Sequence, residues 1–467
     1  MHYIGTLEIT SKYRYGLTSR GTPLYLFKPY DTDLPEFIVG SNIRDRSRDQ
    51  IALVETGESL GDRVRPRANL IRLIGPVGDF EAEQKGLLLH YGSPAAFKKV
   101  AIDPVDESQD GKRIELSSET GWYTYHVDPL GCRDIDDAIA YNRETGETAI
   151  TIADAAAFVT PGSELDKSAC AIGATFYDLN GKVLLPMLPS AVSEEAASLC
   201  PGQRRRGLTL IIDREGKETF VLSWITVQHS FTYESFEDEI NDQAALTNVL
   251  TGSELSPFDP HKVIETLMIR YNTAVARKLV ELKAGLLRTQ AAADAAKISH
   301  WTAIDPRLTA LANEAAAYTS LPTEDGGETS HASIGSVYCH ASSPLRRYAD
   351  LVNQRVIKAD MLDRTVALDE ALDLHLNHRT KANRRWARDL TFLTKVTPGR
   401  IHHIDVLWIS DDQVWVPEWK RIIRVSHERP VSVGSDGLGF SIVEDKIAIF
   451  CDPSKRNWKT RVLTAEV

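Results

Sequence analysis

Four aspartates lie within ten consecutive residues of this chain, and this segment constrains the fold more than any other. They are Asp128, Asp134, Asp136 and Asp137. Carboxylates that are buried together repel one another, so bringing them into one site is costly unless cations compensate. An acidic cluster is ordinarily a solvated turn, but apolar residues such as Ile135 separate and flank these aspartates. The pattern therefore favours a partly buried acidic site.

The chemistry of such a site is that of hard oxygen ligands. An EF-hand calcium loop does not fit, because Ala138 stands two positions after Asp136 and the required Gly and Glu are missing at their offsets. Carboxylates in this arrangement suit Mg²⁺, with Mn²⁺ as an alternative, and such ions can activate water and hold a phosphate. The five cysteines are scattered without the spacing of a zinc site.

Composition places the chain among ordinary folded proteins. Its 467 residues predict several domains, and 42% hydrophobic with 25% charged residues argues against fibrous and largely disordered chains. The apolar stretches are far shorter than the ~18 residues that span a bilayer, and the N-terminus lacks the apolar core of a signal peptide. We therefore expect a cytoplasmic protein that does not contact a membrane.

Turn residues divide the chain into four parts. Residues 1–92 and 399–467 consist of short β-segments between turns, which predicts a small β-barrel at each end. Residues 93–111 contain Pro and Gly and are predicted to be a linker. Residues 112–398 mix a strand over 148–154 with helices over 260–282, 345–358 and 372–393, which predicts an α/β domain.

The helix predicted over 372–393 is strongly basic, although the whole chain has a net charge of −11. Between residues 375 and 400, Asp389 is the only acid beside seven Lys and Arg residues. A charge run is usually a solvated helix face. The imbalance of sign and the interleaved Trp386 instead favour a surface that follows phosphates.

Five collinear segments resemble the RNase II/RNase R (RNB-domain) family of 3′-to-5′ exoribonucleases, which includes the catalytic subunit of the exosome. The segments are the aspartate cluster, residues 152–163, residues 185–189, residues 343–350 and residues 376–379 with the basic helix. The resemblance implies a multidomain protein in which an α/β catalytic RNB domain is flanked by small OB-like barrels. The first barrel is similar to a cold-shock domain, and the last is an RNA-binding one.

The resemblance also implies roles for individual residues. Asp136 is expected to be the residue whose loss abolishes turnover, with Asp128, Asp134 and Asp137 as further metal ligands and Arg346 at the scissile phosphate. Residues expected to bind RNA are Tyr177, Arg347, Arg379, Arg384, Arg385 and Arg388. Asn383 and Arg384 occupy a neighbourhood where the family often has a glutamate.

Structural alternatives stand beside these roles. Arg346 or Arg347 can form an ion pair with Asp350 at helical spacing. An isolated aromatic such as Tyr177 is usually a core residue, and its neighbour Phe176 is expected in the core. The tryptophans of the last part either stack on RNA or fill a small core; they are Trp408, Trp415, Trp419 and Trp458.

The function that the resemblance implies is processive hydrolysis of single-stranded RNA from a free 3′ end, with release of nucleoside 5′-monophosphates. The enzyme would depend on Mg²⁺ and act as a monomer. The alternative is a catalytically inactive protein that keeps the RNB fold and binds RNA or helps to assemble a complex.

Overall fold

The computed structural model describes most of the chain. The described residues are 1–13, 15–31, 33–57, 65–92, 100–239, 259–322, 329–396, 400–410, 413–419, 421–424, 435–436, 439–440, 444–451 and 462–464. Part of the predicted linker (93–99) and residues 397–399, at the predicted start of the last domain, lie outside these ranges. Among the helices described here, none combines the length and the apolar character needed to cross a membrane.

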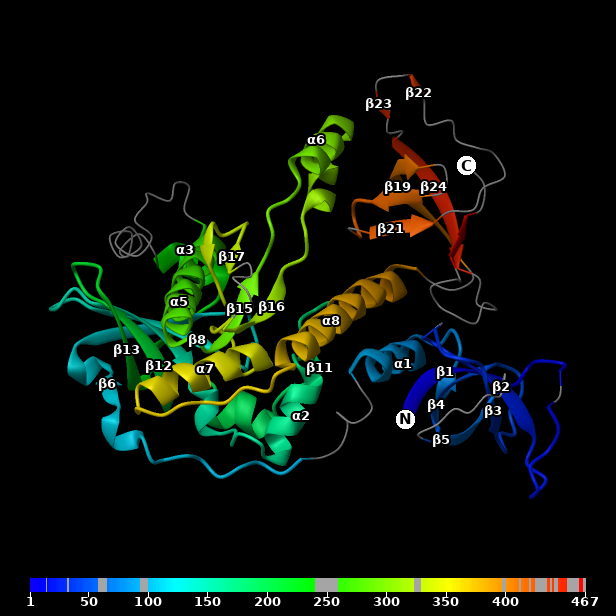
Figure 1. Cartoon of the computed structure of the whole chain (residues 1–467), viewed down its shortest axis with the longest axis horizontal. Helices are drawn as coiled ribbons and strands as arrows, with labels where there is room; N and C mark the ends of the chain where they lie inside the picture. The colour runs from blue at the N-terminus through cyan, green and yellow to red at the C-terminus, as the bar shows by residue number, and fades with distance from the viewer. Residues whose placement is uncertain are drawn as a thin grey trace.

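Five strands near the N-terminus close into a barrel in the order β1-β2-β3-β5-β4 (Figure 1). They are β1 (His2–Glu8), β2 (Leu24–Pro29), β3 (Phe37–Gly40), β4 (Gln50–Glu55) and β5 (Arg67–Pro76). Apolar side chains such as Leu7, Phe27 and Phe37 fill the interior and are fully buried. Helix α1 (Phe80–Gly92) follows and packs against both the barrel and the later helix α8.

A seven-stranded sheet forms the centre of the molecule, in the order β14-β7-β8-β9-β12-β13-β6. Its strands are β6 (Ile114–Leu116), β7 (Trp122–Val127), β8 (Asp137–Asn142), β9 (Thr148–Ala153), β12 (Arg204–Ile212), β13 (Glu218–Thr226) and β14 (His229–Phe231). The middle strand β9 is buried at every position, because structure covers both faces of the sheet there.

Helices and small hairpins surround this sheet. The helices are α2 (Glu164–Ile172), α3 (Tyr233–Glu239), α5 (Pro260–Leu282), α6 (Ala295–Ile304), α7 (Tyr348–Asp360) and α8 (Leu372–Lys395). Shorter helical turns are η2 (Asp110–Lys112), η3 (Ser118–Thr120), η4 (Ala155–Ala157), η5 (Ala191–Ala196) and η7 (Pro306–Ala312). The hairpins are β10 (Phe176–Tyr177) with β11 (Val183–Leu185), β15 (Gly285–Thr289) with β16 (Ala317–Leu321), and β17 (Ser330–His331) with β18 (Ser336–Val337).

Local signals explain where α5 begins, but not where α7 begins. Asp259 caps α5 by accepting a hydrogen bond from the backbone N–H of His261, and Pro260 occupies the first turn, so the prediction over 260–282 is confirmed. The helix predicted from Leu345 begins only at Tyr348. Arg346 therefore lies in the turn before α7, and Arg347 is its N-cap residue.

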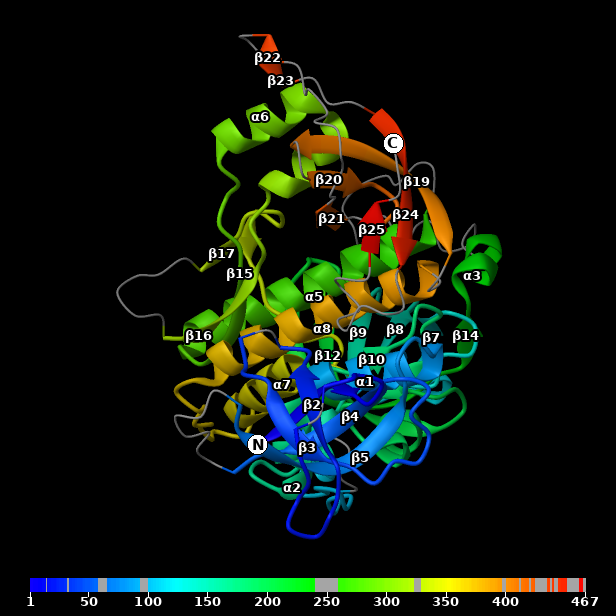
Figure 2. The same ribbon diagram turned by 90° about the vertical axis from the view of Figure 1, so that its right-hand side faces the viewer.

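The C-terminal strands form a five-stranded sheet in the order β21-β20-β19-β24-β25. Its members are β19 (Ile401–Ser410), β20 (Gln413–Val416), β21 (Arg421–Arg424), β24 (Glu444–Cys451) and β25 (Val462–Thr464), and a separate pair is β22 (Ser435–Asp436) with β23 (Gly439–Phe440). Trp408, Trp415 and Trp419 are buried, which confirms the core alternative for them; Trp458 lies outside the described residues. Helix α8 runs between this sheet and the N-terminal barrel (Figure 2).

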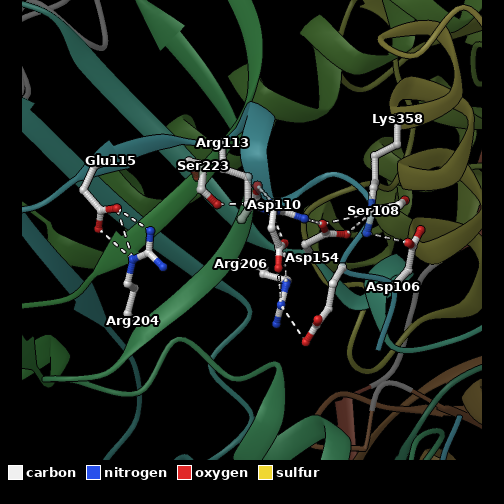
Figure 3. A network of polar contacts seen from close by, with 12 residues as sticks. Asp106, Ser108, Asp110, Arg113, Glu115, Asp154, Arg204, Arg206, Ser223 and Lys358 are labelled. Carbon is white, nitrogen blue, oxygen red and sulfur yellow. Dashed lines mark hydrogen bonds and ion pairs between the residues drawn. The ribbon is translucent and has the colours of Figure 1, made fainter. Parts of the chain in front are cut away.

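A buried network of ion pairs joins the central sheet to α7 (Figure 3). Asp154, which follows β9, accepts hydrogen bonds from Lys358 of α7 at 2.7 and 2.8 Å and from Arg113. Arg206 pairs with Asp110 beside it, and Arg204 pairs with Glu115. Both arginines belong to strand β12, which begins at Arg204.

A multidomain protein with an α/β centre and a small β-domain at each end is thus confirmed. The predicted boundaries at residues 92, 111 and 398 stay predictions.

Candidate active site

The aspartate cluster lies where β7 and β8 meet at one end of the central sheet. Asp128 directly follows β7, and Asp137 is the first residue of β8, so the antiparallel pairing of the two strands brings both ends of the segment together. The backbone N–H of Asp128 donates to Phe231 of β14, and the carbonyl of Asp136 accepts from Ala153 at the end of β9. The sheet itself therefore fixes both ends of the acidic segment.

Asp136 is buried and is held by the turn that precedes α7. Its Oδ1 accepts a hydrogen bond from the backbone N–H of Leu345 at 2.9 Å, and its Oδ2 pairs with Nε of Arg346 at 3.2 Å. Burial raises the pKa of Asp136 to about 7, although Arg346 and the Leu345 N–H act in the opposite direction. Arg346 also donates to Ser343 Oγ at 2.9 Å, and its side chain is 43% exposed.

Asp137 carries the least compensated charge of the cluster. Burial raises the pKa of Asp137 well above its ordinary value, and the neighbouring carboxylates of Asp128 and Asp136 raise it further. Arg346 and Arg347 lower it, but they do not outweigh these effects. The site thus gathers negative charge that the described side chains only partly neutralise.

Asp134 contacts Tyr177, which the resemblance implied to bind RNA. The hydroxyl of Tyr177 donates to Asp134 Oδ2 at 3.0 Å, and burial together with this carboxylate raises the pKa of Tyr177. Phe176 is fully buried against Trp386, as expected. Trp386 in turn donates its indole N–H to the carbonyl of Tyr177, so α8 holds the strand that presents the tyrosine.

One contact of the cluster was missed by the sequence reasoning. Nδ1 of His126 lies 2.8 Å from Asp128 Oδ2, and His126 is buried. A residue two positions before Asp128 on a strand points to the same face, so the spacing could have revealed it. A cavity of about 610 Å³ opens beside this pair and the loop 129–133.

The two arginines before α7 have different partners. Arg347 donates to Asp350 at 2.7 Å, which is the ion-pair alternative. Arg346 reaches Asp136 instead, and its backbone carbonyl accepts from Thr175, two residues before Tyr177. Arg346 and Tyr177 therefore approach the acidic loop from two paired segments.

Helix α8 presents its basic residues on more than one face. Lys381, Arg385 and Arg388 line a groove of about 1440 Å³ between the N-terminal barrel, α8 and the C-terminal sheet. Arg384 lies on another face, toward β15 and β16, where its charge acts on Arg288 and Tyr318. Asn383 donates to the carbonyl of Thr175 and so helps to hold β10.

Arg379 and Asp389 tie domains together. Arg379 is buried and donates to the carbonyls of Ile172 and Tyr91, and it also lines the groove, so its role in RNA binding stays a prediction. Asp389 accepts a hydrogen bond from Tyr91 of α1 at 2.5 Å and lies 3.5 Å from Arg421 of β21. The single acid of the basic segment thus joins α1, α8 and the C-terminal sheet.

The acidic loop fits a divalent cation in its chemistry. Within the described ranges, no three His, Cys, Asp or Glu side chains are gathered tightly enough to form a complete metal site. Mg²⁺ does not require such a cage, because it commonly binds to one or two carboxylates and completes its shell with water and substrate phosphates. The raised pKa of Asp137 beside Asp128 and Asp136 marks the place where a cation would relieve repulsion.

Comparison with known proteins shows the class to which this fold belongs. The chain matches the family model of the RNB domain over residues 113–256 and 247–362, and it therefore belongs to the RNB-domain family. The resemblance inferred from the motifs is confirmed.

Individual relatives agree with this assignment. A probable exosome complex exonuclease RRP44 of Caenorhabditis elegans is 24% identical over 440 residues, which cover 73% of this chain and 45% of the relative. The apo form of Mycoplasma genitalium RNase R has a TM-score of 0.71 at 17% identity and covers 100% of this chain and 90% of that one. Yeast Ssd1, described as a pseudonuclease, has a TM-score of 0.70 at 17% identity and covers 91% and 65%.

The two structural likenesses show the fold. The chain spans about a quarter to a half of the length of curated relatives that it matches.

Proposed function

We propose that this chain is a processive hydrolytic 3′-to-5′ exoribonuclease that degrades single-stranded RNA to nucleoside 5′-monophosphates. The observation that carries the proposal is the acidic loop: four carboxylates at one end of the sheet, incompletely neutralised, with Arg346 on Asp136 and Tyr177 on Asp134. The family membership and the exonuclease relative support the same reaction.

The proposed reaction is a displacement at phosphorus. The oxygen of a water molecule bonds to the last phosphodiester phosphorus, and the bond to the 3′ oxygen of the preceding nucleotide breaks. The leaving oxygen gains a proton, and a nucleoside 5′-monophosphate is released. Arg346, which is partly exposed, can donate from its remaining N–H groups to the scissile phosphate while it stays on Asp136.

Mg²⁺, or Mn²⁺ in its place, would supply an activated water and would neutralise charge that grows on the phosphate. Asp128, Asp136 and Asp137 are the carboxylates that we assign to hold it. Asp134 would orient Tyr177, whose ring would stack on the terminal nucleotide. The groove lined by Lys381, Arg385 and Arg388 would hold the RNA backbone before it reaches these residues.

A second function has an observation in its favour. Three of the four aspartates already have protein partners, so part of the cluster is satisfied without a cation: Asp136 pairs with Arg346, Asp134 with Tyr177 and Asp128 with His126. The likeness to the pseudonuclease Ssd1 fits the same alternative, an RNB fold that binds RNA without cutting it.

Digestion of 5′-labelled linear poly(A) separates the two functions. The enzyme should shorten the RNA from its 3′ end in Mg²⁺, release AMP, and stop in EDTA. A circular RNA should stay intact, because it has no 3′ end. Binding of linear RNA without any cleavage in Mg²⁺ or Mn²⁺ would establish the pseudonuclease instead, and cleavage of the circle would exclude the exonuclease.

A further inference from the structure

Arg288 is a buried cation whose guanidinium has no hydrogen-bond or ion-pair partner in the described part of the chain. It lies in β15, is 3% exposed, and its Nη1 is buried without a hydrogen bond. The guanidinium lies over the ring of Tyr318, 4.7 Å from the centroid. Its backbone N–H, by contrast, donates to the carbonyl of Tyr338.

The surroundings of Arg288 add positive charge. Burial lowers the pKa of Arg288, and the nearby charges of Arg384 and Arg347 lower it further. Burial and the same arginines keep the pKa of His340 well below its ordinary value, so this histidine is neutral at pH 7. Asp350 is an acid of this region among the described residues, and its Oδ1 already accepts from Arg347 at 2.7 Å and from the Ser343 N–H at 2.8 Å.

A buried guanidinium without an anion is strongly unfavourable, and proteins retain such a group where a ligand supplies the missing charge. The ring of Tyr318 holds the planar fork of Arg288 in one orientation, which prepares it for a bidentate acceptor such as a phosphate. Tyr318 is itself fixed, because Asn377 of α8 bonds both its backbone N–H and its carbonyl and its hydroxyl lies 2.8 Å from Nδ1 of His340.

The position of this group relates it to the acidic loop. Arg347 is adjacent in sequence to Arg346, which contacts Asp136. Arg384, whose charge acts on Arg288, is adjacent on α8 to Arg385, which lines the groove. An enzyme that removes the 3′-terminal nucleotide leaves all other phosphates of its substrate on the 5′ side of the bond it cuts. A second phosphate site near Arg346 must therefore serve an upstream phosphate.

We propose that Arg288, with Arg347 and Arg384, forms a subsite for one RNA backbone phosphate on the 5′ side of the scissile phosphate. The inference rests on the proposed function, since it assumes that RNA is the substrate. The subsite would hold the strand in register behind the cleaved bond, and Arg288 is its central residue because it alone is buried and unpaired.

The experiment tests whether Arg288 contacts one particular phosphate of the RNA. RNA binding is measured in EDTA, so that turnover plays no part, with oligomers that carry a single neutral methylphosphonate at each of the phosphates nearest the 3′ end. In the wild type, the neutral linkage at one position upstream of the scissile phosphate should weaken RNA binding roughly ten- to a hundredfold. This is the scale of a lost charge-assisted hydrogen bond. Arg288→Met should weaken binding of unmodified RNA similarly, and the neutral linkage at that position should then have no further effect.

Two further variants serve as controls. Arg143→Met removes an exposed arginine in the turn between β8 and β9 and should leave both measurements unchanged. Arg288→Lys keeps the charge but loses the planar fork, so its affinity for RNA should lie between those of the wild type and Arg288→Met. It replaces Arg288→Met in the test if the methionine variant fails to fold. Arg288→Met should not unfold more easily than the wild type when RNA is absent, because it removes an unpaired buried charge.

The outcomes are distinct. If every neutral linkage weakens RNA binding by Arg288→Met and Arg288→Lys as much as it weakens binding by the wild type, no phosphate contacts Arg288. The subsite is then overturned, while the proposed function stands. Destabilisation of Arg288→Met with unchanged RNA binding would make Arg288 a purely structural residue. Failure of the wild type to bind RNA at all would overturn the proposed function itself.

Discussion

Two acidic groups lie at the same end of neighbouring strands and have opposite electrostatic states. Asp137 begins β8 opposite Ile152, and Asp154 follows β9 two residues after Ile152. Burial raises the pKa of Asp137, and its neighbours Asp128 and Asp136 add to the effect. Burial also opposes the charge of Asp154, but Lys358 and Arg113 outweigh it and lower the pKa of Asp154.

The difference separates an acid that stabilises the fold, Asp154, from acids of the proposed active site, Asp136 and Asp137. Asp154 is fully buried and paired with two cations, so it fastens α7 to the sheet (Figure 3). Asp136 and Asp137 are incompletely compensated although they are at the end of the adjacent strand. Burial alone does not distinguish the two groups; the balance of charge around each carboxylate does.

The largest effect is expected from Asp136→Asn. Hydrolysis of RNA should fall by at least about a hundredfold, the scale of removing a group that acts on transition-state charge, while RNA binding stays near the wild-type level. The free energy of unfolding should not decrease, because the variant removes a carboxylate whose charge burial disfavours. Single-turnover cleavage, filter binding and urea denaturation measure the three quantities. Cleavage within a few-fold of the wild type would remove Asp136 from the active site.

Asp154→Asn should show the converse pattern. It leaves Lys358 and Arg113 buried without their shared anion, and breaking such a pair costs about 3–5 kcal/mol of unfolding free energy. Urea denaturation at pH 7 measures this loss. Glu164→Gln, which breaks the exposed pair with Lys167, is the matched control and should behave like the wild type. Equal stability of the two variants would show that Asp154 stabilises the fold no more than an exposed acid does.

The stability that Asp154 contributes should depend on pH. Because the pKa of folded Asp154 lies below its ordinary value of 3.8, its stabilising effect is present above that value and is lost as the pH falls through the lower folded value. The difference in unfolding free energy between the wild type and Asp154→Asn should therefore stay constant near neutral pH and shrink in strong acid. A difference that grows on acidification would contradict the lowered pKa of Asp154.

The smallest effect concerns arginines rather than aspartates. Arg385 and Arg388 line the groove and form no ion pair with a described acid, whereas Arg204 and Arg277 are exposed but paired with Glu115 and Glu218. Replacing Arg385 and Arg388 by Ala should reduce the slope of log affinity for RNA against log salt by about 0.7 for each lost phosphate contact. Replacing Arg204 and Arg277 by Ala should leave this slope unchanged. Identical slopes in both double variants would show that the groove does not hold RNA.

The sequence by itself determined the acidic loop, the order of a β-domain, an α/β domain and a second β-domain, and the helix α5. Asp128, Asp134, Asp136 and Asp137 are close in the chain, so their proximity follows from local geometry. Periodicity and capping are equally local, and they placed α5 correctly. These features depend on neighbours within a few residues, which a pattern can record.

Only the tertiary structure decided which charged side chains remain available. Asp136 meets Arg346 across 210 positions, and Arg379 is withdrawn from solvent by Tyr91, 288 positions away. Arg379, Arg384 and Arg385 look alike in the sequence. Arg379 and Arg385 both line the groove, but Arg379 is buried and bonded to backbone carbonyls whereas Arg385 is exposed, and the charge of Arg384 acts on Tyr318. The charge run specifies how many cations α8 carries. The packing of α8 between α1, the hairpins and the C-terminal sheet specifies which of them a ligand can reach, because each face of a helix takes its environment from segments distant in the chain.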